Sequence, residues 1–114
     1  MDKFMFIYRG GDFTKLPPEE AQANMQQWFA WMDELKNDNR LISTGPLQPI
    51  GKQITGKRKM VTDGPFSEAK EIVGGYTIIT AESLEEATKI AEGCPVLPAD
   101  GMVEIRPLRD VMPR

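Results

Sequence analysis

Four charged side chains are the best candidates for chemistry in this sequence: Arg9, Asp63, Glu104 and Arg106. Asp63 opens the stretch Asp63-Gly64-Pro65-Phe66, in which aspartate, glycine and proline are all turn-forming residues. A stiff turn of this kind would hold a carboxylate beside the ring of Phe66. Asp63 is therefore the candidate catalytic or ligand-orienting group.

Glu104 and Arg106 alternate within the stretch 102–107, so a strand there would present both on one face. If this last strand lies beside the first, both side chains come close to Arg9. Charges that face a buried seam must be paired, because an uncompensated buried charge costs several kcal/mol.

Two interpretations of this polar set stay open. The first is an internal ion-pair network that fixes the register of a dimer. The second is a small polar pocket in an aromatic wall, which would bind a polar or anionic ligand. The residues of that pocket would be Tyr8, Arg9, Trp31, Asp63, Phe66, Glu104 and Arg106.

Several other chemistries lack the residues they need. The chain has no histidine, which removes the usual neutral-pH acid–base group and the commonest metal ligand. Cys94 is the single cysteine and reads as a small buried hydrophobe. The pairs Gly10-Gly11 and Gly74-Gly75 fit no nucleotide-binding fingerprint. We therefore expect no metal and no cofactor.

Composition indicates one globular domain over residues 1–114. The net charge is −3, and the basic residues Lys52 and 57–59 read first as a solvated hairpin tip, so we expect no nucleic-acid role. A single cysteine suits a reducing cytoplasm. No stretch approaches the roughly 20 apolar residues of a membrane span, so we expect a cytoplasmic protein without a membrane partner.

Periodicity and turn residues predict the order of the elements. The expected segments are a strand over 3–9, a helix from Pro17-Pro18 to 37–39, a strand at 41–43, a hairpin over 53–61 turning at Gly56-Lys57, a strand over 72–80 with a bulge at Gly74-Gly75, a helix from the capping box at Ser83 to Gly93, and a strand over 102–107.

This order predicts an α+β, ferredoxin-like βαββαβ fold with an inserted hairpin. Its sheet is antiparallel and carries both helices on one face. The other face would expose Tyr76, Ile78 and Met102, which together are too apolar to leave in water. We therefore expect a homodimer in which a second copy covers that face.

Four motifs in the same order resemble the DGPF-domain proteins of the YCII-related family, over nearly the whole chain. They are Asp63-Gly64-Pro65-Phe66, Glu71-Ile72-Val73-Gly74-Gly75-Tyr76, Ala91-Glu92-Gly93-Cys94-Pro95 and Val103-Glu104-Ile105-Arg106-Pro107. The resemblance implies a dimeric α/β barrel with a cleft between two sheets. Some relatives carry a histidine and an aspartate in the cleft, suggested to act as a hydrolytic pair. The aspartate would correspond to Asp63, and the histidine has no counterpart here.

Three functions remain open at this point. The preferred one is a dimeric binding or accessory protein with a polar cleft near the Asp-Gly-Pro-Phe turn. The second is an enzyme of unknown specificity, hydrolase-like, in which Asp63 acts with Arg9 or Arg106 stabilising negative charge. The third is a protein-interaction role through the dimer or the Pro-rich loop 45–51. It is suggested by the resemblance, since many DGPF proteins occur with extracytoplasmic-function sigma factors.

Overall fold

The structure is a computed structural model that describes residues 1–11, 16–64 and 72–109 of the chain. The described elements, in chain order, are β1 (Asp2–Gly10), α1 (Pro18–Asn37), β2 (Leu41–Pro46), β3 (Gly51–Thr55), β4 (Met60–Gly64), β5 (Val73–Ala81), α2 (Leu84–Ala91) and β6 (Gly101–Pro107). The predicted order of strands and helices is confirmed.

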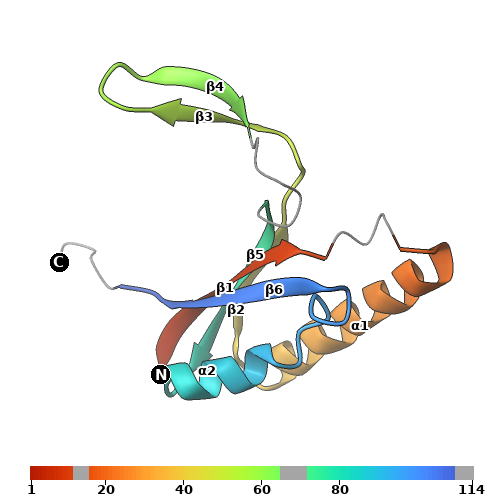
Figure 1. The fold of residues 1–114 in the computed structure, drawn as a ribbon. Helices are drawn as coiled ribbons and strands as arrows, with labels where there is room; N and C mark the ends of the chain where they lie inside the picture. The colour runs from red at the N-terminus through yellow and green to blue at the C-terminus, as the bar shows by residue number, and fades with distance from the viewer. Residues whose placement is uncertain (12–15, 65–71, 110–114) are drawn as a thin grey trace.

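Four strands form an antiparallel sheet in the order β2-β5-β1-β6, and both helices cover one of its faces (Figure 1). This is the ferredoxin-like arrangement that the sequence predicts. β1 is an inner strand of this sheet. From Phe4 onward every residue of β1 is buried or half-buried, so both faces of the strand are covered, as is typical of an inner strand. The strand pair β3–β4 forms a separate two-stranded sheet and does not extend the main one.

The hydrophobic core lies between the sheet and the helices. Phe6 is fully buried and stacks on Trp31 of α1, with ring centroids 6.0 Å apart. Tyr8 meets Trp28 edge-on at 5.0 Å. The buried apolar residues are Phe4, Phe6, Tyr8, Trp31, Leu35, Ile79, Ala81, Ala87, Ala91, Cys94 and Val96.

A chain of hydroxyl groups crosses this core. The Tyr8 hydroxyl donates to Thr77 Oγ1 at 2.6 Å, and Thr77 Oγ1 lies 2.9 Å from Thr44 Oγ1. These residues come from β1, β5 and β2, so the bonds link three neighbouring strands. They satisfy polar groups that would be costly to bury alone.

Local signals set the ends of the elements. α1 begins at two prolines, and Asn39 just beyond it adopts the left-handed conformation with φ 57°. Ser83 accepts the amide N–H of Glu86 at 3.1 Å, which is the predicted cap of α2. The helical spacing in this segment also predicts that α2 buries Leu84 together with Ala87, Ile90 and Ala91. This is wrong for Leu84, which lies in the first turn of α2 and is 48% exposed.

The predicted irregularity at Gly74-Gly75 is confirmed. Tyr8 pairs with Gly75 and Arg9 with Val73, so Gly74 is an extra residue on β5. Gly75 also approaches β2 closely, because an added Cβ would lie 2.9 Å from the Gly45 carbonyl oxygen. The bulge ends the regular pairing of β1 with β5, just before the charged residue Arg9.

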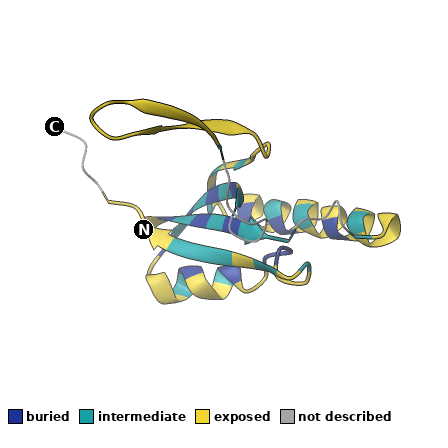
Figure 2. Cartoon of the chain, turned by 45° about the horizontal axis from the view of Figure 1, so that its top comes forward, coloured by how far each residue is buried: buried dark blue, intermediate teal, exposed yellow. Residues whose placement is uncertain are grey.

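The β3–β4 hairpin, residues 51–64, projects from the domain as an arm on the side of the sheet opposite the helices (Figures 1 and 2). Of its residues only Gly64 is partly buried, and the others are exposed. The radius of gyration is 15.8 Å, whereas a compact chain of this length has about 13 Å. The arm therefore makes the single chain more open than a self-contained domain.

The structure bears on one further sequence expectation. Neither helix of the described residues has the combination of length and apolar character that a membrane span requires.

Candidate functional site

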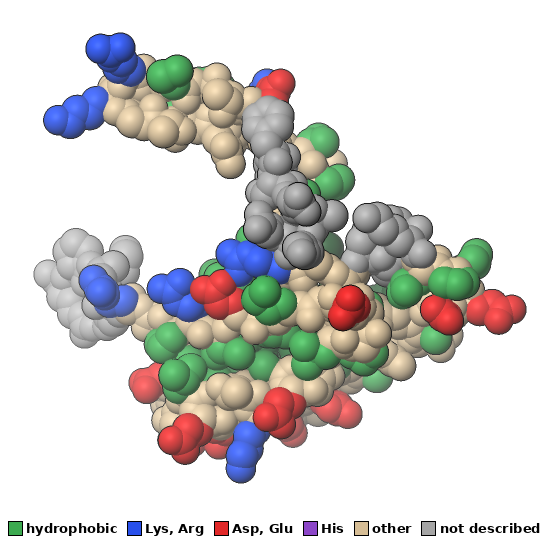
Figure 3. Space-filling view, in the orientation of Figure 1, with side chains coloured by type: hydrophobic (Ala, Val, Ile, Leu, Met, Phe, Trp, Pro, Cys, Tyr) green, Lys and Arg blue, Asp and Glu red, His purple; other side chains and the backbone are tan. Residues whose placement is uncertain are grey.

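The sheet surface opposite the helices, here called the open face, carries the candidate site. Its residues are the ones that alternate with the core residues: Met5, Ile7, Arg9, Tyr76, Ile78, Met102, Glu104 and Arg106. Most are half-buried by their neighbours, and Met102 is 52% exposed. Figure 3 shows this face as the floor of a hollow beneath the arm, with basic and acidic side chains gathered along it. The open face therefore combines apolar strand positions with a local group of charges.

Three of these residues form one ion cluster. Arg9 donates from Nη1 to Glu104 Oε1, and Arg106 donates from Nη1 to Glu104 Oε2 at 3.2 Å. The Arg9 and Glu104 side chains are 27% and 34% exposed, while Arg106 is 64% exposed. The sequence places all three on neighbouring strands, and the structure brings them together as predicted.

The cluster carries more positive than negative charge. The guanidinium of Arg106, and secondly that of Arg9, hold the pKa of Glu104 below its usual value of 4.5. Glu104 is therefore ionised at neutral pH, and one carboxylate serves two guanidinium groups. The cluster therefore keeps a net charge of +1, and Arg106 is the most exposed of its three side chains.

Two aromatic residues predicted for the same pocket lie elsewhere. Tyr8 and Trp31 are each 7% exposed and pack in the core, on the helix side of the sheet. Burial raises the pKa of the Tyr8 hydroxyl well above its ordinary value. The predicted aromatic wall around Arg9 is wrong for these two residues. The strand alternation excludes it, since Tyr8 and Arg9 are consecutive and must point to opposite faces.

Asp63 lies away from the ion cluster. It belongs to β4 of the arm, where it pairs with Lys52 of β3 and makes an ion pair with that ammonium group. Its side chain is 72% exposed. The prediction of a turn at Asp63-Gly64 is wrong, because both residues are in a strand. Phe66 and the rest of that motif fall outside the described residues.

A shallow hollow at the base of the arm includes Asp63. Its volume is about 560 Å³, and its lining residues are Pro49, Ile50, Gly51, Lys52, Asp63 and Gly64. Neither this hollow nor any other described part of the chain gathers three or more acidic or cysteine side chains that could hold a metal ion. The carboxylate is thus available at a surface but is already paired with a lysine.

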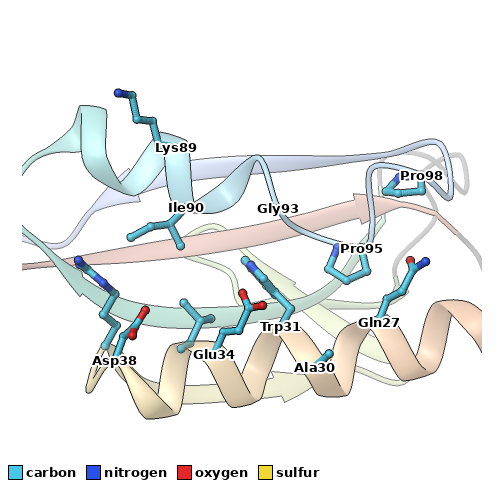
Figure 4. Close-up of a pocket in the computed structure, with 12 residues that line it drawn as sticks. Gln27, Ala30, Trp31, Glu34, Asp38, Lys89, Ile90, Gly93, Pro95 and Pro98 are labelled. Atoms are coloured by element: carbon cyan, nitrogen blue, oxygen red, sulfur yellow. The ribbon is translucent and has the colours of Figure 1, made fainter.

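A second hollow, here called the α1–α2 groove, was not predicted from the sequence. It lies on the helix side and has a volume of about 670 Å³. Trp31 and Ile90 contribute apolar surface, and Glu34 and Asp38 contribute carboxylates (Figure 4). Its residues come from α1, the turn after α1, α2 and the loop after α2, so no local pattern could have signalled it.

Comparison with known proteins identifies the family. A family model of the YCII-related domain matches residues 1–112. The chain belongs to the YCII-related family. This confirms the family that the sequence motifs indicate, and the match covers every element of this YCII-related domain from β1 to β6.

A similar solved structure was also found. It is 5-chloro-2-hydroxyhydroquinone dehydrochlorinase from Burkholderia phenoliruptrix AC1100, in a complex with 2,5-dihydroxybenzoquinone. The similarity covers 90% of each chain, at 19% sequence identity and a TM-score of 0.49. No curated protein matches this YCII-related chain.

Cys94 has the structural role that the sequence predicts. It is 1% exposed and packs in the core. Burial raises the pKa of its thiol to about 12, so it carries almost no thiolate at neutral pH. A nucleophilic role for Cys94 is therefore not part of the candidate site.

Proposed function

We propose that the protein is a homodimeric binding protein that holds a small organic anion between two facing sheets. The observation that carries the proposal is the ion cluster on the open face, in which Glu104 is shared by Arg9 and Arg106. The cluster supplies an excess positive charge on an otherwise apolar surface.

The exposed surface of the single chain supports the dimer. Its accessible area is 8632 Å², whereas a compact monomer of this mass exposes roughly 6,300 Å². The excess of roughly 2,300 Å² per chain, or roughly 4,600 Å² for two chains, lies within the total area of about 2,000–5,000 Å² that obligate homodimers bury. The open face and the arm are the surfaces that a second copy would cover.

The ligand class follows from the charge that this dimer would enclose. Two open faces brought together would bury two clusters, each with a charge of +1. Removing such charges from water without compensation costs several kcal/mol. A carboxylate or another small anion would offset that cost, and a planar guanidinium can donate two parallel hydrogen bonds to it.

The two arginines have different roles in this proposal. Arg9 is the less exposed and anchors Glu104 from the neighbouring strand. Arg106 is 64% exposed and its bond to Glu104 is longer, so it is the group that would turn to meet the anion. Apolar neighbours such as Ile7 and Tyr76 would contact the body of the ligand.

The proposal gives Asp63 no catalytic role. In the single chain its carboxylate is exposed and paired with Lys52. It lacks the dry surroundings that activate a carboxylate as a general base. The enzymatic and protein-interaction interpretations drawn from the sequence therefore stay predictions without a specific contact to support them.

A thermal-shift experiment tests the proposal. Millimolar carboxylates of increasing size are added to the wild type, each beside its neutral amide, since a ligand at 100 times its dissociation constant stabilises the protein by about 2.7 kcal/mol. We expect at least one carboxylate, but not its amide, to raise the melting temperature. Arg106→Gln should lose this shift. The matched control is Lys36→Gln, which removes one exposed charge at the end of α1 and should keep it.

The result that would overturn the anion site is equally specific. Amides that stabilise as well as the carboxylates would show that the charge of the ligand is irrelevant. Equal shifts in Arg106→Gln and Lys36→Gln would show that the ion cluster does not bind the ligand.

A further inference from the structure

The arm carries apolar side chains that the single chain leaves uncovered. Ile54 is 69% exposed, Met60 62% and Val61 60%, and Ile50 at the base of the arm is 75% exposed. A two-stranded hairpin by itself is at best marginally stable in water. The arm therefore needs another surface to pack against.

The charge of the arm excludes the open face of its own chain as that surface. The turn at its tip carries Lys57, Arg58 and Lys59, three consecutive cations. The open face has its own positive excess from Arg9 and Arg106 over Glu104. Like charges would repel if the tip folded back onto the sheet of its own chain. The receptor of the tip should be acidic.

The α1–α2 groove has the chemistry to receive a long cationic side chain. Within the described residues neither Glu34 nor Asp38 makes an ion pair. Trp31 and Ile90 supply apolar surface beside these carboxylates. Such a groove can hold the aliphatic stem of an arginine against Ile90 and the small exposed part of Trp31 while the carboxylates bind its guanidinium.

Two cationic residues, Arg40 and Lys89, also line the groove, but they do not neutralise the carboxylates of Glu34 and Asp38. The Arg40 guanidinium is paired with Glu86 at 2.7 Å, so its charge is already balanced. Lys89 stands at the rim, and its ammonium group points away from the groove (Figure 4). Glu34 and Asp38 thus leave the exposed wall of the groove acidic.

We propose that the Arg58 tip of each arm docks in the α1–α2 groove of a second copy of this chain. The proposal rests on the sheet-to-sheet dimer proposed above and adds a reciprocal clasp to it. The arm rises on the side where that second copy would lie (Figure 1). Packed sheets are about 10 Å apart and five strand residues span about 17 Å. Each arm is therefore longer than the spacing of two packed sheets, so its tip can pass the partner's sheet toward the helix layer behind it.

A charge-reversal cycle tests the clasp, with the dimer dissociation constant measured by sedimentation equilibrium. We expect Arg58→Glu alone and Glu34→Arg alone to raise that constant at least tenfold each. The double variant should return to within about threefold of the wild type, because the exchanged charges attract again. Lys36→Glu is the control, since it reverses an exposed charge outside the groove and should change nothing.

A crosslinking experiment gives a second, independent measurement. Chains with Lys57→Cys are mixed with chains that carry Lys89→Cys, which leaves Arg58, Glu34 and Asp38 in place, and a short bifunctional thiol reagent is added. The clasp predicts crosslinks between the two kinds of chain, while the buried Cys94 stays unmodified. If the two kinds of chain have formed mixed dimers and no such crosslinks appear, the clasp is contradicted.

The outcomes separate this inference from the proposed function. A wild type that is monomeric at every concentration overturns both. A stable dimer whose dissociation constant is unchanged in Arg58→Glu, or is not rescued in the double variant, overturns the clasp alone. In that case the clasp is wrong and the sheet-to-sheet dimer stands.

Discussion

Ile78 offers the sharpest test of the dimer on which the proposed site depends. It lies on the open face in β5, opposite Met5 of β1 and Ser43 of β2, and thus well inside the sheet. Replacing it with arginine adds a third cation to the face that carries Arg9 and Arg106. The core on the other face is untouched, because Thr77 and Ile79 keep their positions.

The size of the effect follows from burial and symmetry. Full burial of an isoleucine side chain is worth about 1.5–3 kcal/mol, but Ile78 is already half-buried by its strand neighbours, so the partner would add about 0.5–1 kcal/mol. A two-fold dimer loses this twice, about 1–2 kcal/mol, and the two unpaired arginines that replace the isoleucines would cost several kcal/mol more at a buried seam. Since each 1.4 kcal/mol is a factor of ten, the dissociation constant of Ile78→Arg should rise at least about a hundredfold. Repulsion between like charges at the seam would add to this effect.

Sedimentation equilibrium over a wide range of concentration measures the change directly. The wild type should give twice the chain mass of 12.8 kDa, and Ile78→Arg should give the single mass. Phe29→Arg is the matched control, because Phe29 is 65% exposed on α1, on the other side of the sheet, and should leave the dimer intact. A dimer of unchanged strength in Ile78→Arg would refute the assignment of the open face as the interface.

Three further predictions concern the single chain. Tyr8→Phe removes a 2.6 Å buried hydrogen bond and should lower the free energy of unfolding by about 1 kcal/mol in urea titration; an unchanged midpoint would contradict this. The pKa of Glu86 is lowered below 4.5, first by the Glu82 amide and then by Arg40, so its stabilising effect should be present above pH 4.5 and fade as the pH falls further. The difference in melting temperature between the wild type and Glu86→Gln should shrink accordingly, and a constant difference from pH 7 to 3 would argue against it. Cys94, whose pKa is raised to about 12, should resist a thiol reagent at pH 8 in the folded protein and react in denaturant; fast labelling of the native protein would disprove its burial.

Much of the fold could be predicted because its signals are local. Two prolines begin α1, Ser83 caps α2, and the bulge at Gly74 is marked by two consecutive glycines. Strict alternation in β6 places Glu104 and Arg106 on one face. Together with the order of strands, this alternation is enough to bring both residues to Arg9, as the structure shows.

The pocket wall could not be predicted in the same way. Both faces of β1 are largely apolar, so its sequence does not say which one the helices cover. Only the packing of Phe6 and Tyr8 against Trp28 and Trp31 decides that question. The sequence alone does exclude one part of the predicted wall. Consecutive residues of a strand point to opposite faces, so Tyr8 and Arg9 cannot line the same surface.

The amino-acid sequence by itself thus determined the succession of elements, the family and the charged triplet on the sheet, because each depends on short-range periodicity or on motifs read along the chain. Only the tertiary structure decided that residues 51–64 leave the sheet as an arm, and that Asp63 goes with them. It also decided that Glu34 and Asp38 meet residues of α2 and its following loop across a groove. The physical reason is that such placements depend on contacts between segments far apart in sequence, whose energies no local pattern encodes.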